Sequence, residues 1–92
     1  MDYNLINANY KYDQLATAIQ SRQLEHFHYN LDRVNFIEML TQDLSADYRS
    51  NIEKRLADTI SRMAEVESIY QALNAQIDDQ TAYDAAVARL TV

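Results

Sequence analysis

The chain contains no glycine and no proline among its 92 residues. Average usage would give about six glycines and about five prolines in a chain of this length. Tight β-hairpin turns usually need glycine, and the phosphate-binding loops of nucleotide-binding proteins are built around it. The chain is also rich in Ala, Leu, Gln, Glu and Arg, which favour helix. The sequence therefore predicts an all-α protein and excludes nucleotide-binding loops.

The length of the chain limits both its domain count and its core. Ninety-two residues form one domain at most, which we assign to residues 1–92. On folding, such a chain hides only about 60–65% of its unfolded surface, so its core is thin. The sequence has no cysteine, which excludes a disulfide scaffold and thiolate metal sites. A thin core that is not reinforced by disulfide bonds favours self-association or binding to another protein.

Membrane and export signals are not expected. The sequence has no run of about 18 apolar residues, so we predict no membrane partner. The segment "MDYNLINANY" lacks the basic region and apolar stretch of a secretory signal peptide. These features favour an intracellular or virion protein over a secreted one.

The net charge is −6, but positive and negative residues alternate along the chain. A helix face of this kind, with (i, i+4) charge pairs, is typically solvated. In this chain, the residues with this pattern are Arg49, Glu53, Lys54, Asp58, Arg62 and Glu65. Lys and Arg are not clustered as a phosphate-binding patch requires, so we predict no nucleic-acid partner. An acidic mimic of nucleic acid would need dense carboxylates, whereas only Asp78 and Asp79 are adjacent acidic residues.

Apolar residues recur at helical spacing over about residues 12–42 and form two stripes. Tyr12, Leu15 and Ile19 make the first stripe. The second, which we expect to form the seam of a helical hairpin, comprises Leu24, Phe27, Leu31 and Val34. The step of five residues between the stripes changes the helical phase near Arg22. Beyond the second stripe, "NFIEML" is apolar on more than one side, which indicates more than one neighbour.

The segment "TQDLSADYRS" is the predicted break between two long helices. Ser45 can cap the second helix, with Asp43 as the competing cap. This helix, over about residues 45–77, carries apolar residues at heptad-like steps that predict a coiled-coil-type seam. They are Ile52, Leu56, Met63, Val66, Tyr70, Leu73 and Ile77, with Thr59 and Ile60 at an intervening layer. The segment "DDQT" then caps a short helix over about residues 80–90.

These elements predict a long antiparallel helical hairpin with a short helix behind it. Residues 1–10 have weak periodicity and are treated as a candidate arm. One hairpin seam cannot cover all the apolar side chains, so we expect hairpins to oligomerise into a multi-helix bundle or to bind another protein. Tyrosine is favoured at such interfaces because it combines an apolar ring with a polar tip. The predicted interface residues are Tyr3, Leu5, Ile6, Tyr10, Tyr12, Phe36, Ile37, Ile60 and Ile69.

The stretch "QLEHFHYNL" places Glu25 and His28 three residues apart. If the hairpin turns near Ser45, Glu65 and Glu67 lie at the same height. Two hairpins would then supply two Glu-x-x-His pairs and further glutamates, the ligand set of di-iron bundles. The set resembles small ferritin-like hairpins, which implies a metal-binding oxidase. The helical phase argues against this alternative, because with the second stripe in the seam Glu25 and Glu65 point outward. The main interpretation has no metal, no cofactor and no catalytic residue.

We therefore expect a non-enzymatic structural, assembly or adaptor protein that acts through helical contacts with itself or another protein. Small cysteine-free helical proteins are common among phage and viral components and among small inhibitors of host machinery. This is an association with a class of proteins and rests on no motif. The alternative is the ferritin-like di-iron module described above, and metal analysis separates the two.

Overall fold

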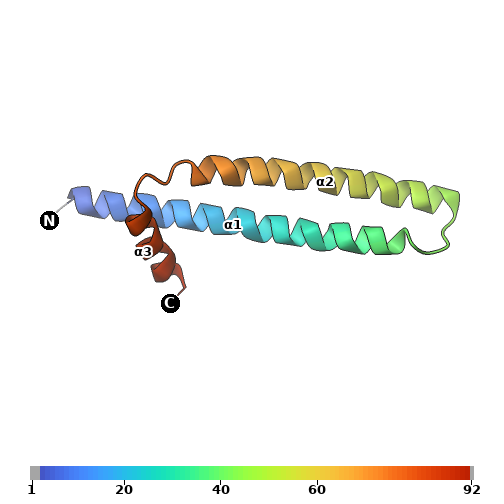
Figure 1. The fold of residues 1–92 in the computed structure, drawn as a ribbon, viewed down its shortest axis with the longest axis horizontal. Coiled ribbons are helices and arrows are strands. Elements are labelled where there is room, and N and C mark those ends of the chain that lie inside the picture. The colour runs from blue at the N-terminus through green and yellow to red at the C-terminus, as the bar shows by residue number, and fades with distance from the viewer. Residues whose placement is uncertain (1–2, 92) are drawn as a thin grey trace.

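The computed structural model describes residues 3–91, with side-chain surroundings described from residue 9 onward. Within this range the chain is all-α, with helices α1 (Tyr3–Met39), α2 (Ala46–Asn74) and α3 (Gln80–Leu90). The two long helices pack antiparallel, and α3 crosses α1 and points away from the hairpin (Figure 1). The molecule is extended, measuring 67 × 24 × 18 Å. The predicted hairpin with a short C-terminal helix is confirmed.

Helix α1 begins earlier than the sequence periodicity indicated. It starts at Tyr3 rather than near residue 12, so the backbone of residues 3–10 is helical and not an irregular lead. The physical reason is that no glycine, proline or capping motif stops the helix from continuing toward the N-terminus. The predicted interface side chains of Tyr3, Leu5 and Ile6 lie outside the described ones, and their role stays a prediction.

The N-terminal ends of α2 and α3 are each capped by a polar side chain. The Ser45 hydroxyl accepts a hydrogen bond from the Tyr48 backbone N–H at 3.3 Å, which confirms Ser45 as the N-cap of α2. The Asp79 carboxylate caps α3 in the same way, accepting from the Ala82 N–H at 3.1 Å. Both connections are formed without glycine. No described residue has a positive φ angle.

The buried core is concentrated at the end of the hairpin where α3 packs. Its fully or nearly buried members come from α1 and α3, and are Tyr12, Leu15, Ala16, Ile19 and Ala86. Ala16 and Ala86 have no exposed surface, and their small side chains let α1 and α3 approach closely. Along α2, Ile52, Thr59 and Val66 are buried at steps of seven residues. The predicted heptad-like seam of α2 is confirmed at these positions, but Ile60, which was expected in an intervening layer, is 50% exposed because it lies about 100° around the helix from Thr59.

The predicted seam of α1 is wrong in its second half. Leu24, Phe27, Leu31 and Val34 face solvent, while half-buried residues such as Arg22, His26 and Arg33 face α2. The step of five residues from Ile19 to Leu24 rotates the apolar stripe by about 140° around the helix. Because α1 is one continuous helix and Tyr12, Leu15 and Ile19 pack against α2 and α3, the second stripe must turn outward.

Candidate interaction surface

The most unusual surface of the chain is the outer stripe of α1, formed by Leu24, Phe27, Leu31 and Val34. These side chains are 58%, 54%, 45% and 47% exposed, respectively. They recur at steps of three and four residues, so they form one continuous row along the helix. Scattered exposed apolar residues are ordinary on a protein surface, whereas a contiguous row is a candidate interaction surface.

The outer stripe is bordered by uncharged residues. At helical spacing its neighbours are Ser21, His28 and Asn35 on one side and Gln23, Asn30 and Ile37 on the other. Gln20 and Glu38 continue the stripe at its two ends. The ring of His28 lies edge-on to Phe27, with ring centroids 5.8 Å apart. Over residues 26–31, the surface that borders the stripe therefore carries no Asp, Glu, Lys or Arg.

Ile60 of α2 lies beside the outer stripe. Gln23 and Glu67 line one side of the hairpin together. Ile60 is seven residues, or two helical turns, from Glu67, so it lies on the same side of α2 as Glu67. Val34 is eleven residues, or about three turns, from Gln23, so it lies on the same side of α1 as Gln23. Because the two helices run antiparallel, moving eleven residues along α1 from Gln23 and seven residues back along α2 from Glu67 brings Val34 and Ile60 to about the same height along the hairpin. Ile60 is 50% exposed and extends the apolar surface from α1 onto α2.

The structure places the other predicted interface residues in several environments. Tyr10, Ile37 and Ile69 are exposed, and Phe36 is half-buried. Ile69 is nine residues from Ile60, which puts the two on opposite sides of α2, so they cannot belong to one surface. Tyr12 is buried against α3 and contributes to the core.

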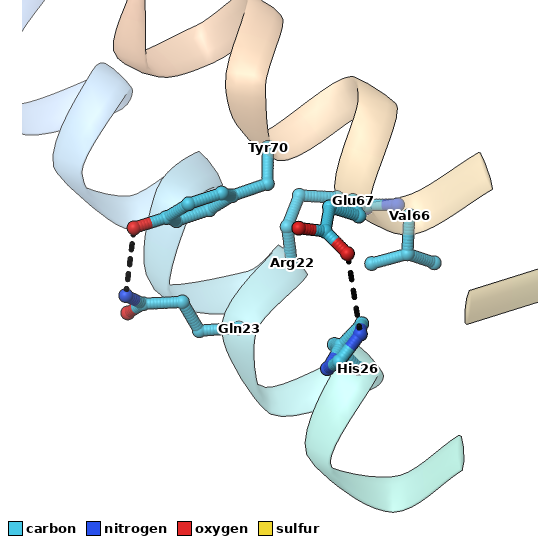
Figure 2. Close-up of a pocket in the computed structure, with 6 residues that line it drawn as sticks. All are labelled: Arg22, Gln23, His26, Val66, Glu67 and Tyr70. Atoms are coloured by element: carbon cyan, nitrogen blue, oxygen red, sulfur yellow. Dashed lines mark hydrogen bonds and ion pairs between the residues drawn. The ribbon is translucent and has the colours of Figure 1, made fainter. Parts of the chain in front are cut away.

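A hollow of about 250 Å³ lies between α1 and α2 near the middle of the hairpin. Figure 2 shows its polar lining, in which Gln23 donates a hydrogen bond to the Tyr70 hydroxyl at 3.4 Å and His26 faces Glu67 at 4.0 Å. Arg22 also lines it and pairs with Glu25 at 2.8 Å. Two of these polar pairs, Gln23 with Tyr70 and His26 with Glu67, join α1 to α2. The hollow is therefore a polar layer of the seam, which the sequence did not predict.

The residues of the metal alternative are not brought together within one chain. Glu25 pairs with Arg22, Glu67 faces His26, and His28 lies on the outer stripe side of α1. Glu65 is exposed on α2. Among the residues that the structure describes, no three His, Asp or Glu side chains cluster so as to hold a metal ion. The two-chain ligand set stays a prediction for a dimer of hairpins.

Helix α3 is fixed to α1 by polar contacts around the core. The Arg89 guanidinium donates two hydrogen bonds to one carboxylate oxygen of Asp13, at 3.0 and 2.6 Å. The Tyr12 hydroxyl donates to Asp78, and Lys11 pairs with the same carboxylate at 3.2 Å. The hydrogen bond to Asp78 raises the pKa of Tyr12 to about 12, and both contacts lower the pKa of Asp78. Burial raises the pKa of Tyr83 in the same region.

Sequence reasoning identified the apolar residues of the outer stripe but placed them in the wrong environment. The signal that could have placed them correctly is the five-residue step after Ile19, which separates the two stripes on any continuous helix. No helix in the described part of the chain is long and apolar enough to cross a membrane. No protein-family model, curated protein or solved structure matches this chain. The exposed apolar residues and the extended shape point to protein partners as a general class.

Proposed function

We propose that this chain is a non-enzymatic structural, assembly or adaptor protein that works through helical protein–protein contacts. The observation that carries the proposal is the outer stripe, four apolar side chains in one row that the chain's own helices leave exposed. A helix that presents such a row at steps of three and four residues is suited to pack against another helix. The class of phage and viral components or small inhibitors of host machinery remains compatible with this role.

The shape of the molecule supports the same proposal. The hairpin is 67 Å long and 24 Å wide, so it exposes a large side surface relative to its volume. Elongated helical hairpins of this kind offer extended contact surfaces rather than enclosed reaction sites. The hollow at Tyr70 has its nearest polar groups paired with one another.

A photo-activatable phenylalanine analogue at Phe27 tests the proposal in the native cell. Illumination should yield protein adducts, either with a second copy of the chain or with another protein, because Phe27 lies in the middle of the outer stripe. The matched control carries the same analogue at Ser61, an exposed position of α2. Leu24→Ser combined with Leu31→Ser should abolish the Phe27 adducts while the helical content stays unchanged. The absence of any adduct above the Ser61 control would contradict the proposed function.

A further inference from the structure

We propose that two copies of this chain pair through the outer stripe, with their α1 helices antiparallel about a two-fold axis near residue 29. The inference rests on the proposed function and names its partner, which is a second copy of the chain. In this arrangement Leu24 lies opposite Val34 of the second copy, and Phe27 lies opposite Leu31. The dimer would then be a bundle of four long helices with the two α1 helices at its centre.

The spacing of the outer stripe matches itself when it is reversed. With Gln20 and Glu38 added at its ends, the steps along the stripe are four, three, four, three and four residues. An antiparallel copy therefore brings each of the four apolar side chains of the outer stripe opposite another of the four. A two-fold interface requires this self-complementarity, because the same surface contributes to both sides.

The charge pattern favours a second copy over a partner recognised by charge. The chain has a net charge of −6, and two such chains repel each other wherever their carboxylates meet. The outer stripe itself and its immediate neighbours are uncharged, so the paired helices meet without like charges at the centre. At the ends, the Gln20 amide can donate to the Glu38 carboxylate of the second copy, whereas a parallel pairing would oppose Glu38 with Glu38.

The position of α3 selects the same register. The row of the outer stripe continues toward the N-terminus through Ala16 and Asp13, which α3 covers by packing and by the Arg89 ion pair. A second helix can therefore use this face only beyond Ile19. When the pairing is centred on residue 29, residues 12–19 of one copy, where α3 packs, lie opposite residues 39–46 of the second copy. Each α3 therefore lies past the C-terminal end of the second copy's α1. In this register α3 of each copy lies beyond residues 20–38 of the other copy, which form the contact.

The size of the contact predicts a modest affinity. Stable interfaces bury about 800 Å² and about 20–30 residues per partner. Here each copy contributes thirteen residues, which are the six positions of the extended stripe, their six neighbours and Ile60, so the interface is smaller than that range. We therefore expect dissociation in the micromolar range rather than the nanomolar range.

Sedimentation equilibrium of the full chain at micromolar concentrations tests the pairing. The wild type should sediment as a dimer in equilibrium with monomer. Leu31→Asp should raise the dimer dissociation constant at least about a hundredfold, because two added carboxylates meet in the apolar centre near the axis. The matched control is Ile69→Asp, since Ile69 is 46% exposed and lies on the other side of α2. Circular dichroism should show unchanged helicity in both variants, because both positions are half exposed in one chain.

Disulfide trapping tests the register, since the natural chain has no cysteine. A mixture of Gln20→Cys and Glu38→Cys chains should give a mixed disulfide dimer on mild oxidation, and neither variant alone should cross-link. Cross-linking of Gln20→Cys with itself would overturn the antiparallel register. A wild type that is monomeric throughout the micromolar range would overturn the self-pairing. The proposed function would then stand if Phe27 still forms adducts with another protein, and would fall if it forms none.

Discussion

The Tyr12 hydroxyl donates a hydrogen bond to the Asp78 carboxylate, joining two residues that are 66 positions apart in the sequence. Asp78 lies in the connection between α2 and α3, and Tyr12 lies on α1 in the buried core. One contact therefore fixes where α3 begins relative to the hairpin. Lys11 adds an ion pair to the same carboxylate, so Asp78 is held from two adjacent residues.

We predict that this contact limits stability at both extremes of pH. The folded-state pKa of Asp78 lies below its ordinary value of 3.8, so its stabilising effect is present above about pH 4 and is lost as the pH falls through the folded value. The folded-state pKa of Tyr12 is raised from 10.0 to about 12, so its effect is present below pH 10 and is lost as the pH rises toward 12.

Asp78→Asn tests this pair through the titration of Tyr12. Carbon NMR of the tyrosine rings should show the pKa of Tyr12 moving from about 12 back toward 10, because the neutral amide no longer disfavours the phenolate. Asp84→Asn, which removes an exposed carboxylate of α3, is the control and should leave Tyr12 unchanged. An unaltered Tyr12 titration in Asp78→Asn would show that the hydrogen bond is not formed in solution.

The seam is predicted to depend on Ile52 rather than on Leu24. Ile52→Ala should lower the free energy of unfolding by about 2–5 kcal/mol, because it removes a side chain that is only 1% exposed and leaves a cavity. Leu24→Ala should change it by about half a kcal/mol or less in dilute, monomeric protein, because Leu24 faces solvent. Urea denaturation measures both values. Equal losses would show that the second stripe of α1 occupies the seam after all.

The packing of α3 on α1 is predicted to tolerate no larger side chain at Ala86. Ala86→Leu should destabilise the protein by about 1–3 kcal/mol, because Ala86 has no exposed surface and the added atoms must separate the helices. Ala85→Leu is the matched control, since Ala85 is exposed on the same helix and has nearly the same propensity cost. Thermal unfolding followed by circular dichroism distinguishes the two. Comparable stability of both variants would contradict the close approach of α1 and α3.

Arg49 is predicted to stabilise the turn of the hairpin. Its guanidinium donates hydrogen bonds to the backbone oxygens of Leu40 and Gln42 at 3.0 and 2.9 Å, at the negative end of the α1 dipole. Arg49→Ala should cost about 1 kcal/mol in urea denaturation, and Arg49→Lys should recover only part of it because an ammonium group lacks the fork of donors. Arg55→Ala, at an exposed position of α2, should be nearly neutral.

The three helices followed from the sequence because their signals are local. The absence of helix breakers, the caps at Ser45 and Asp79, and the unbroken heptad pattern of α2 each act within a few residues. The orientation of α1 did not follow, because the helix carries two apolar stripes and either could have faced α2. The choice depends on α3, which packs on Tyr12 and Ala16 from 70 residues away. The polar contact between His26 and Glu67 in the seam is a consequence of that choice.

The largest buried cluster lies at the α3 end of the hairpin, so we expect α1 to have a gradient of local stability. No residue of α1 between residues 20 and 39 is buried, whereas the segment from Tyr12 to Ile19 is held by both neighbouring helices. Backbone amides in a solvent-exposed part of a helix are protected only by the helix itself, so their hydrogens exchange through small, frequent openings. Amide exchange should therefore be slowest near Leu15 and fastest near the turn. We expect the part of α1 near the turn to open more often than the part that packs against α3.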